Sequence, residues 1–345
     1  MQSASKLSHF DCSPITSNCF TGNLLPLHTK IVSLETLIRA SSRALVIGVG
    51  GGGDVVGALA TARFLEFCGL RFHLGGLSWE RFVYDPVPGP RRLVEIENAR
   101  ILHPRAWMVN ANTQTHYGVR FSETEMAALY GWEVLHVDIN AGVAGAVDGL
   151  EAAIAALGTD LLVGIDVGGD SLAQGGEAGL RSPLADAIML AAFTELEKRG
   201  HSTLWGVFGY GSDGELTTHE IERALARVAE AGGLLGAWAL TPQVVSELED
   251  VVEKVPTEAS AIPLRCARGA WGEGRIRYDE RRVQLTPLTI LTFYLSASVL
   301  FHTLSLPAQA VAASTSLEEA NDALHRIGIK SELDIERERL QEKRP

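Results

Sequence analysis

The chain has 345 residues, of which 46% are hydrophobic and 21% charged, enough for one large core or two modest ones. Its net charge of −12 at pH 7, with no run rich in lysine or arginine, makes nucleic acid and anionic membranes poor partners. The four cysteines contain no C-x-x-C pair, which is typical of the reducing cytoplasm and excludes a disulfide framework or a zinc site. We therefore expect a cytoplasmic protein whose partner is a small molecule, and the sequence leaves open association between copies of the chain.

Two segments test whether the chain is secreted or membrane-bound. Residues 1–30 are polar and mixed, without the apolar segment of a signal peptide, and we expect a flexible tail there. The longest apolar run, Leu285–Leu306, approaches membrane length. Thr286 as N-cap and Pro287 at the first helical position instead predict a buried helix of a globular domain.

From Leu34 onwards, short continuous apolar runs alternate with helical patterns. After a short helix over 34–40, strands are expected at 45–47, 72–74, 106–109, 133–137, 161–165 and 203–208, with helices between most of them. This alternation predicts an α/β fold with three layers, in which a mainly parallel, doubly wound, Rossmann-like sheet is covered on both faces. We expect one such domain over residues 31–310. It would end in a hairpin at 274–285 and the apolar helix, and a charged helix from Leu317 would occupy the segment 311–345.

The first strand leads into the glycine-rich stretch ALVIGVGGGGDVVGALATARFLEFC at 44–68. A strand, a glycine turn and a helix N-terminus together present backbone N–H groups without partners, which favours binding of an anion. We assign this role to Gly50, Gly51, Gly52 and Gly53. Gly48, Gly50 and Gly53 also satisfy the G-x-G-x-x-G spacing of dinucleotide-binding proteins.

Two features disfavour NAD(P) or FAD as the cofactor. The second predicted strand ends in Gly75 and Gly76, where the dinucleotide fingerprint requires a carboxylate for the ribose. Asp54 lies beside the glycine turn and would repel a bare pyrophosphate unless a metal ion came between them. The alternative for Asp54 is a favourable helix-start residue and nothing more.

Polar residues follow the other predicted strands, and parallel strands bring their carboxyl ends to one edge of a sheet. They are Asn110 and Asn112 after the third strand, Asp138 after the fourth, Asp166, Gly168, Gly169 and Asp170 after the fifth, and Gly209–Glu215 after the sixth. Carboxylates that converge with glycine turns are typical of sites where a divalent cation bridges protein and substrate phosphates. We predict Mg²⁺ or Mn²⁺ at Asp54, Asp166 and Asp170. The alternative for Asp166 and Asp170 is structural, because an aspartate after a strand can accept hydrogen bonds from turn N–H groups.

Further roles follow from this hypothesis. Asp166, Asp170 and Arg181 would be catalytic, with Arg181 neutralising charge that develops on the substrate. Substrate contacts would come from the glycine turn and from Asn110, Asn112, Asp138, Gly168 and Gly169. A group of arginines, Arg265, Arg268, Arg275 and Arg277, is either an anion clamp or a set of solvated hairpin charges. The long connection 75–92 is either a lid or an irregular surface segment.

The sequence thus predicts an enzyme, of the transferase or hydrolase class, that acts on a small anionic metabolite, phosphorylated or nucleotide-like, with the help of a divalent metal. One alternative is a metal-independent lyase, cyclase or isomerase that uses an aspartate as base, since carboxylates in one cleft cannot all ionise. Another alternative is a metabolite sensor without catalytic activity.

Three stretches of the chain carry a resemblance to a family. GVGGGGDVVGALATARFLE, DVGGDSLAQGGEAGLRSPLADAIMLAAF and QLTPLTILTFYL together resemble the archaeal and bacterial family known as domain of unknown function 1152. The likeness runs from about Ala44 to Leu306, without the tail and the final charged helix. It implies a Rossmann-like fold, and because no established reaction comes with it, it assigns no catalytic residue.

Overall fold

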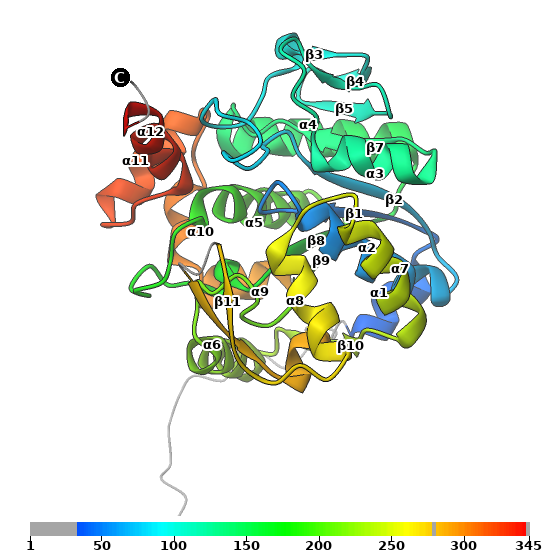
Figure 1. The fold of residues 1–345 in the computed structure, drawn as a ribbon, viewed down its shortest axis with the longest axis vertical. Helices are drawn as coiled ribbons and strands as arrows, with labels where there is room; N and C mark the ends of the chain where they lie inside the picture. Colours follow the sequence, from blue (N-terminus) through cyan, green and yellow to red (C-terminus); the bar gives the residue numbers. More distant parts are fainter. Residues whose placement is uncertain (1–32, 278–280, 343–345) are drawn as a thin grey trace, which may run out of the picture. The chain divides into compact units, whose positions relative to one another are not determined.

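The computed structural model describes residues 33–277 and 281–342 (Figure 1). The tail expected for residues 1–30 lies outside the described residues, as do the last three residues of the chain.

One large mixed sheet forms the centre of the fold. Its strands are β1 (Arg43–Gly48), β2 (Arg71–Leu77), β4 (Arg100–His103), β5 (Ala106–Val109), β7 (Val134–Val137), β8 (Leu161–Val167), β9 (Thr203–Phe208), β10 (Leu234–Ala239) and β13 (Leu291–Leu295). They lie in the order β10-β13-β9-β8-β1-β2-β7-β5-β4. The five adjacent strands β9, β8, β1, β2 and β7 are parallel to one another. At both edges of the sheet, each further strand pairs antiparallel with its neighbour. The predicted α/β fold with a mainly parallel centre is confirmed.

Helices cover both faces of this sheet and make it the middle of three layers (Figure 1). One face packs against α1 (Leu34–Ala40), α2 (Asp54–Phe67), α3 (Ser122–Tyr130), α7 (Pro242–Val252) and α8 (Glu258–Ala267). The other face packs against α4 (Gly142–Leu157), α5 (Pro183–Lys198), α6 (Thr218–Glu230), α9 (Ala297–Thr303), α10 (Leu306–Val311), α11 (Leu317–Arg326) and α12 (Glu332–Glu342).

The residues of β1 show why the central strands read as unbroken apolar runs. Leu45 and Ile47 belong to the core on the α5 side, while Ala44 and Val46 belong to the core on the α2 side. A strand buried on both faces needs apolar residues at every position. Gly57 of α2 lets this helix lie directly on the sheet, because a Cβ atom there would be 2.4 Å from the Val167 side chain.

The direction of winding reverses between β1 and β8. The connections from β1 to β2 and from β2 to β7 carry α2 and α3 on one face, whereas α4 and α5, around β8, lie on the opposite face. The chain therefore leaves the ends of β1 and β8 in opposite directions. In doubly wound sheets, ligands bind outside the carboxyl ends of the strands at such a switch point.

Several elements differ from the prediction. β5 is antiparallel to β7, because the tight β4–β5 connection turns the chain over just before it. The apolar run predicted as one helix contains a short 3₁₀ turn after Thr286, then β13, which lies between β9 and β10, and then α9. Periodicity alone does not distinguish a buried strand from a buried helix. Two strands of the sheet, β4 and β10, were not predicted at all.

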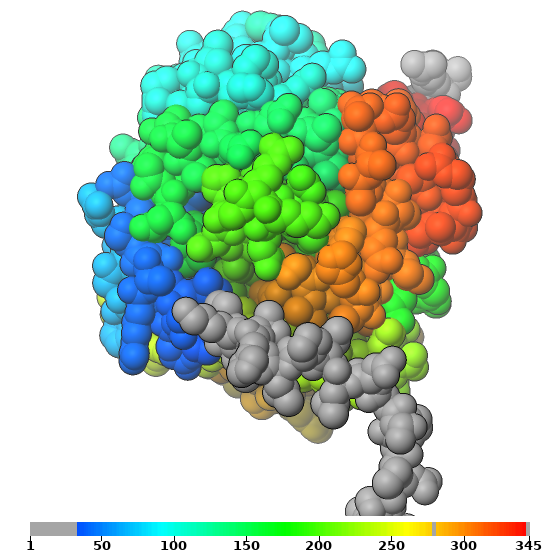
Figure 2. Space-filling model, turned by 180° about the vertical axis from the view of Figure 1, so that it is seen from behind, coloured from blue at the N-terminus to red at the C-terminus, as the bar shows by residue number. Residues whose placement is uncertain are grey.

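The last hundred residues pack on the same sheet. The predicted hairpin is present as β11 (Gly272–Ile276) and β12 (Arg281–Leu285), a separate two-stranded sheet. The predicted final helix is divided into α11 and α12, with Gly328 at φ +80° between them. In Figure 2 the orange surface of α9 and α10 lies beside the green surface of α5 and adjoins α11. Among the described residues, no helix is long and apolar enough to cross a membrane.

Candidate metal centre

The turn between β1 and α2 is built from glycines because the backbone reverses in very little space. Gly51 and Gly52 have φ values of +77° and +50°, and a Cβ atom on Gly48 would lie 2.4 Å from the backbone of Asp54. The Gly50 N–H donates to the Asp54 carboxylate at 3.0 Å, and the Gly52 N–H donates to the Trp79 carbonyl at 2.8 Å. Two of the four glycine N–H groups predicted to hold a substrate anion are therefore already used by the protein.

The turn after β8 is arranged around Asp166, whose side chain is fully buried. Asp166 accepts hydrogen bonds from the Gly169 N–H and the Ser171 N–H, both at 3.0 Å, and from the Ser171 hydroxyl. Gly168 and Gly169 have φ values of +120° and +114°, which side chains disfavour. The Gly168 N–H donates to the Phe208 carbonyl. Because both N–H groups are occupied, these two glycines form the turn and do not present free donors to a substrate in this structure.

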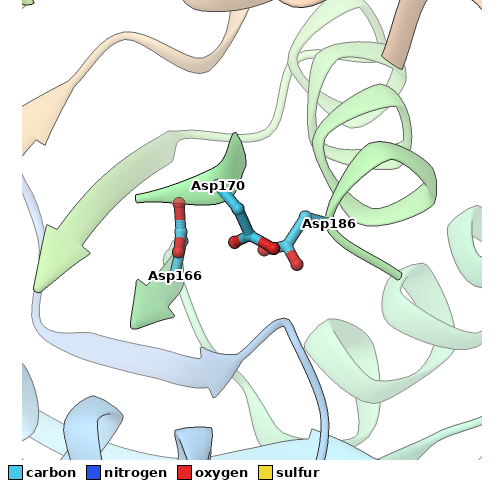
Figure 3. Close-up of side chains that lie close together, drawn as sticks. All are labelled: Asp166, Asp170 and Asp186. Carbon is cyan, nitrogen blue, oxygen red and sulfur yellow. The ribbon is translucent and has the colours of Figure 1, made fainter. Parts of the chain in front are cut away.

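Asp166, Asp170 and Asp186 form a compact group at the switch point. One oxygen from each can be chosen so that all three lie within 4.8 Å of one another, and all three residues are buried. They come from the end of β8, the turn after it and the first turn of α5, and Figure 3 shows Asp170 and Asp186 directed toward each other. Asp186 Oδ1 is buried without a hydrogen-bond partner among the described residues.

The position of Asp186 depends on how α5 begins. Ser182 is the N-cap residue, but its hydroxyl bonds to Glu215 and Asp170 instead of the helix backbone. The free N–H groups of Leu184 and Ala185 are bound instead by the Glu332 carboxylate of α12, at 3.0 and 2.8 Å. The C-terminal helix thereby fixes the helix end that carries Asp186.

A second acidic group shares Asp170 with the first. Asp170, Asp213 and Glu215 can also place one oxygen each within 4.8 Å of the others. Glu215, however, already has a cation, since Arg281 Nη1 lies 2.7 Å from its Oε1. It also accepts hydrogen bonds from the N–H groups of Arg181 and Ser182. A cavity of about 310 Å³ adjoins Glu215, between the β11–β12 hairpin and the start of α6.

The buried carboxyl groups hold protons more tightly than usual. Burial raises the pKa of Asp54, Asp170, Asp186 and Asp213 well above the ordinary range, and neighbouring carboxylates raise it further. Burial also raises the pKa of Asp166, although its hydrogen bonds oppose this shift. So many negative charges cannot coexist in a buried site without protons or a cation. Oxygen ligands of this kind suit Mg²⁺ or Mn²⁺.

The predicted metal ligands are therefore only partly brought together. Asp166 and Asp170 are in the compact group, whereas the third member is Asp186 and not Asp54. Asp54 is still close, because a Cβ atom on Gly50 would lie 2.6 Å from Asp54 Oδ2 and 3.4 Å from Asp186 Oδ2. Asp186 was missed because an acidic residue in a first helical turn reads as a helix-start residue. The usable signal was a single carboxylate in the otherwise apolar segment PLADAIMLAAF.

Asn110 and Asn112 were predicted at the wrong edge of the sheet. In the antiparallel pair of β5 and β7, Val109 lies opposite Val134, so Asn110 follows β5 at the edge where β7 begins. There the Asn110 side chain donates to the Asn98 carbonyl and accepts from the Asn112 N–H, both within a local turn. These two residues are remote from the carboxylates at the ends of β1 and β8.

Asp138 and Arg181 lie where the sequence placed them but have local partners. Asp138 is fully buried two strands from β1, and it binds Arg105 Nη1 at 2.8 Å and the Asn140 N–H at 2.7 Å. Arg181 is exposed, and its guanidinium donates to the carbonyls of Ala178 and Leu180. Arg281, which the sequence did not single out, is the arginine paired with the acidic cluster.

The other predicted arginines divide into two kinds. Arg265 and Arg275 are exposed, and Arg268 pairs with Glu249 on the surface at 2.6 Å, which is the solvated arrangement. Arg277 is different, because its Nε atom is buried.

β2 continues to Leu77, beyond the glycines at which the predicted strand ended. The sequence indicated no carboxylate at the end of this strand. The structure places one shortly after it, Glu80, which is buried. Its two oxygens accept hydrogen bonds from the N–H groups of Arg81 and Ser122. Both oxygens are thus engaged inside the protein.

The doubly wound sheet with its polar turns at the switch point defines a Rossmann-like α/β protein. A family model described as "Protein of unknown function (DUF1152)" matches residues 45–340, and the chain belongs to this family. The match continues through α11 and most of α12, farther than the expected end near Leu306. No curated protein and no solved structure matched the chain.

Proposed function

We propose that the protein is a cytoplasmic enzyme that acts on a small anionic metabolite with the help of Mg²⁺ or Mn²⁺. The metal would be held by Asp166, Asp170 and Asp186 at the switch point, and the reaction would be the transfer or hydrolysis of a phosphorylated or nucleotide-like group. The acidic net charge supports a small molecule over nucleic acid or a membrane surface as the partner.

The observation that carries this proposal is the buried acidic group without its own cation. Among the described residues, Glu215 is the only member of the two acidic groups in an ion pair, which it forms with Arg281. Asp186 is 2% exposed, and its Oδ1 atom has no hydrogen-bond partner among the described residues. An unpaired buried charge is costly, so a divalent cation would relieve both the repulsion and the missing contact.

The residues of this group and around it would have different roles in the proposed reaction. Asp166 is oriented by three hydrogen bonds from its own turn, so its carboxylate is preorganised as a ligand. Asp54, beside the metal ligands and with a raised pKa, is suited to exchange a proton with the substrate. The Glu215–Arg281 pair neutralises the second acidic group, which favours one metal over two.

NAD(P) and FAD remain disfavoured in this proposal. Both oxygens of Glu80 accept hydrogen bonds from backbone N–H groups, so this carboxylate is not available to a ribose. In addition, the Asp54 carboxylate already accepts from the Gly50 N–H in the glycine turn.

The proposal is tested by metal binding to the purified full chain. Mn²⁺ should raise the melting temperature and bind measurably by calorimetry, and Asp186→Asn should lose most of this response. Asp138→Asn is the matched control, because it removes a buried carboxylate at the same sheet edge outside the acidic group. If Mn²⁺ and Mg²⁺ leave the wild-type melting temperature unchanged and no heat of binding is measured, the metal proposal is wrong.

The raised pKa of Asp54 also favours a second candidate, a metal-independent lyase, cyclase or isomerase in which this carboxyl group exchanges protons with the substrate. In that case a metabolite library would stabilise the protein equally with and without EDTA. Asp54→Asn would then abolish turnover, whereas Asp186→Asn would reduce it only in part.

A further inference from the structure

Three arginines lie around the acidic cluster, from two separate parts of the chain. Arg81 lies over the glycine turn, where a Cβ atom on Gly52 would be 2.7 Å from its Cγ. Arg277 follows the last residue of β11, and Arg281 is the first residue of β12. The hairpin thus brings two guanidinium groups toward the side of the molecule on which β1 and β8 end.

The three arginines are not equally compensated. Arg281 is paired with Glu215 at 2.7 Å. Arg81 has only a long contact of 4.0 Å to Glu258, and that carboxylate also accepts the backbone N–H of Arg277. Within residues 33–277 and 281–342, no carboxylate lies within 4.0 Å of a side-chain nitrogen of Arg277, and its Nε has no hydrogen-bond partner.

The conformation of Arg277 is also unusual. Its φ of +58° falls in the left-handed region, which is rare outside glycine and is retained where the surroundings impose it. Burial lowers the pKa of this guanidinium to about 10, and repulsion from Arg81 and Arg281 contributes to the shift. Glu215 and Asp213 act against this shift, but among the described residues neither forms an ion pair with Arg277.

Arg281 closes an ion pair with the acidic cluster through Glu215, whereas Arg81 and Arg277 close none with its described carboxylates. Burial and the Asp166 charge raise the pKa of Asp54, and the positive charge of Arg277 opposes this shift, although the two side chains form no ion pair within 4.0 Å. Among the described residues, Asp166, Asp170 and Asp186 have no cation, and Arg277 has no carboxylate within 4.0 Å. A metal ion and a bound oxyanion would satisfy both at once.

We propose that Arg81 and Arg277 bind a phosphate or diphosphate group of the substrate, directly beside the metal held by the aspartates. This inference rests on the proposed function and narrows the anionic metabolite to a phosphate ester or diphosphate. Two guanidinium groups and a divalent cation offer more contacts than the two coplanar oxygens of a carboxylate accept. A phosphate group, with at least three oxygens and nearly two negative charges, matches them.

The test uses pyrophosphate and malonate as probes, with the full-length protein in calorimetry at fixed Mg²⁺. Wild-type protein should bind pyrophosphate at least tenfold more tightly than malonate. Arg277→Gln should weaken pyrophosphate binding at least tenfold and leave the affinity for Mg²⁺ alone unchanged. Arg275→Gln, on the exposed face of the same strand, is the matched control and should change neither.

Arg81→Gln provides an independent variant should Arg277→Gln fold poorly, and it should weaken pyrophosphate binding in the same way. Unchanged pyrophosphate affinity in a folded variant of either arginine, or equal binding of malonate, would overturn the phosphate assignment while Mg²⁺ binding still supports the metal centre. If the wild-type protein does not bind Mg²⁺ at all, the proposed function is wrong. The arginine site is then judged by pyrophosphate binding in EDTA, where failure to bind refutes it as well.

Discussion

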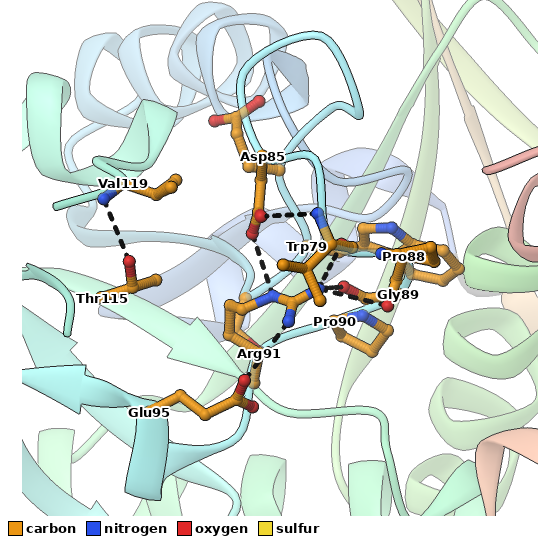
Figure 4. A network of polar contacts seen from close by, with 12 residues as sticks. Trp79, Asp85, Pro88, Gly89, Pro90, Arg91, Glu95, Thr115 and Val119 are labelled. Atoms are coloured by element: carbon orange, nitrogen blue, oxygen red, sulfur yellow. Dashed lines mark hydrogen bonds and ion pairs between the residues drawn. The ribbon is translucent and has the colours of Figure 1, made fainter. Parts of the chain in front are cut away.

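Two buried charged regions of this molecule differ in one respect, the presence of counter-charges. Arg91 is 3% exposed and is paired with two carboxylates, with Asp85 Oδ2 at 2.9 Å from its Nε and Glu95 Oε1 at 3.3 Å from its Nη1. Its Nη2 donates to the carbonyls of Pro88 and Gly89 within the same loop (Figure 4). The group Asp166, Asp170 and Asp186 is just as buried, yet it has no cation among the described residues.

The comparison distinguishes buried charges that stabilise the fold from buried charges for which we propose a function. The Arg91 network closes on itself, so it ties down the connection 75–92, which is anchored further by the bond from Trp79 Nε1 to Glu336 of α12. The segment that the sequence left open as a lid or a surface excursion is thus packed against the body of the protein. The acidic group, by contrast, has no counter-charge among the described residues, and for that reason we propose a function for it.

The largest expected effect comes from breaking the compensated region. Arg91→Met should lower the free energy of unfolding by about 3–5 kcal/mol, because Asp85 would remain buried without its counter-charge. Urea unfolding followed by circular dichroism measures this loss. Arg92→Met, at the exposed neighbouring position, should change stability by less than about 0.5 kcal/mol. Similar stability of the two variants would show that the Arg91 network is not what holds this loop.

The same kind of change in the uncompensated region should affect binding and not folding. Asp170→Asn removes a carboxylate shared by both acidic groups, and we expect at least a hundredfold loss of Mn²⁺ affinity, or about 2.7 kcal/mol. Calorimetry on the variant measures it. Without metal, the variant should be as stable as wild type or more stable, because one source of repulsion is gone. A clear loss of metal-free stability would mean that Asp170 is a structural residue.

The pH dependence of stability should distinguish the metal-free from the metal-bound protein. Burial raises the pKa of Glu332 from 4.5 to about 8, and those of Asp54, Asp170, Asp186 and Asp213 are also raised. Groups with a raised pKa bind more protons in the folded chain, so stability must fall as pH rises from about 4 to about 8. We expect a decline on the order of 2 kcal/mol in EDTA.

Saturating Mg²⁺ should reduce that decline, since the ion favours the ionised carboxylates. Urea unfolding at pH 4.5, 6 and 8, with and without Mg²⁺, measures both slopes. Glu332→Gln is the matched variant and should make the EDTA slope shallower. Stability that increases over this range in EDTA would contradict the buried, protonated state of these groups.

The smallest effect is expected where a buried pair needs no charge. Burial raises the pKa of Glu123 to about 8 and lowers that of His136 to about 3, so both are neutral at pH 6. Their 3.2 Å contact is therefore a hydrogen bond between neutral groups and not an ion pair. Glu123→Gln should cost less than about 1 kcal/mol at pH 6. The His136 ring should show no titration by NMR between pH 5 and 8. A titration midpoint in that range would show that the His136–Glu123 contact is an ion pair.

Local signals predicted much of the fold. The apolar runs of β1, β8 and β9 and the glycine turns after them are encoded within a few residues, and the sequence located them. The same signals did not reveal the direction of β5, because antiparallel and parallel strands share one residue pattern. They also failed for β13 (Leu291–Leu295), which lies between two strands that are distant from it along the chain.

For the candidate site, the sequence by itself determined that Asp54, Asp166 and Asp170 stand at the ends of strands beside glycine turns. Only the tertiary structure decided that Asp186 joins Asp166 and Asp170, that Arg281 neutralises Glu215, and that the Nε atom of Arg277 is buried. The reason is physical, since strand ends are set by neighbouring residues whereas the distance between two side chains depends on packing between elements far apart in the chain. Whether a buried carboxylate has a counter-charge depends on such a distance. The presence of a counter-charge distinguishes the Arg91 network from the proposed metal centre.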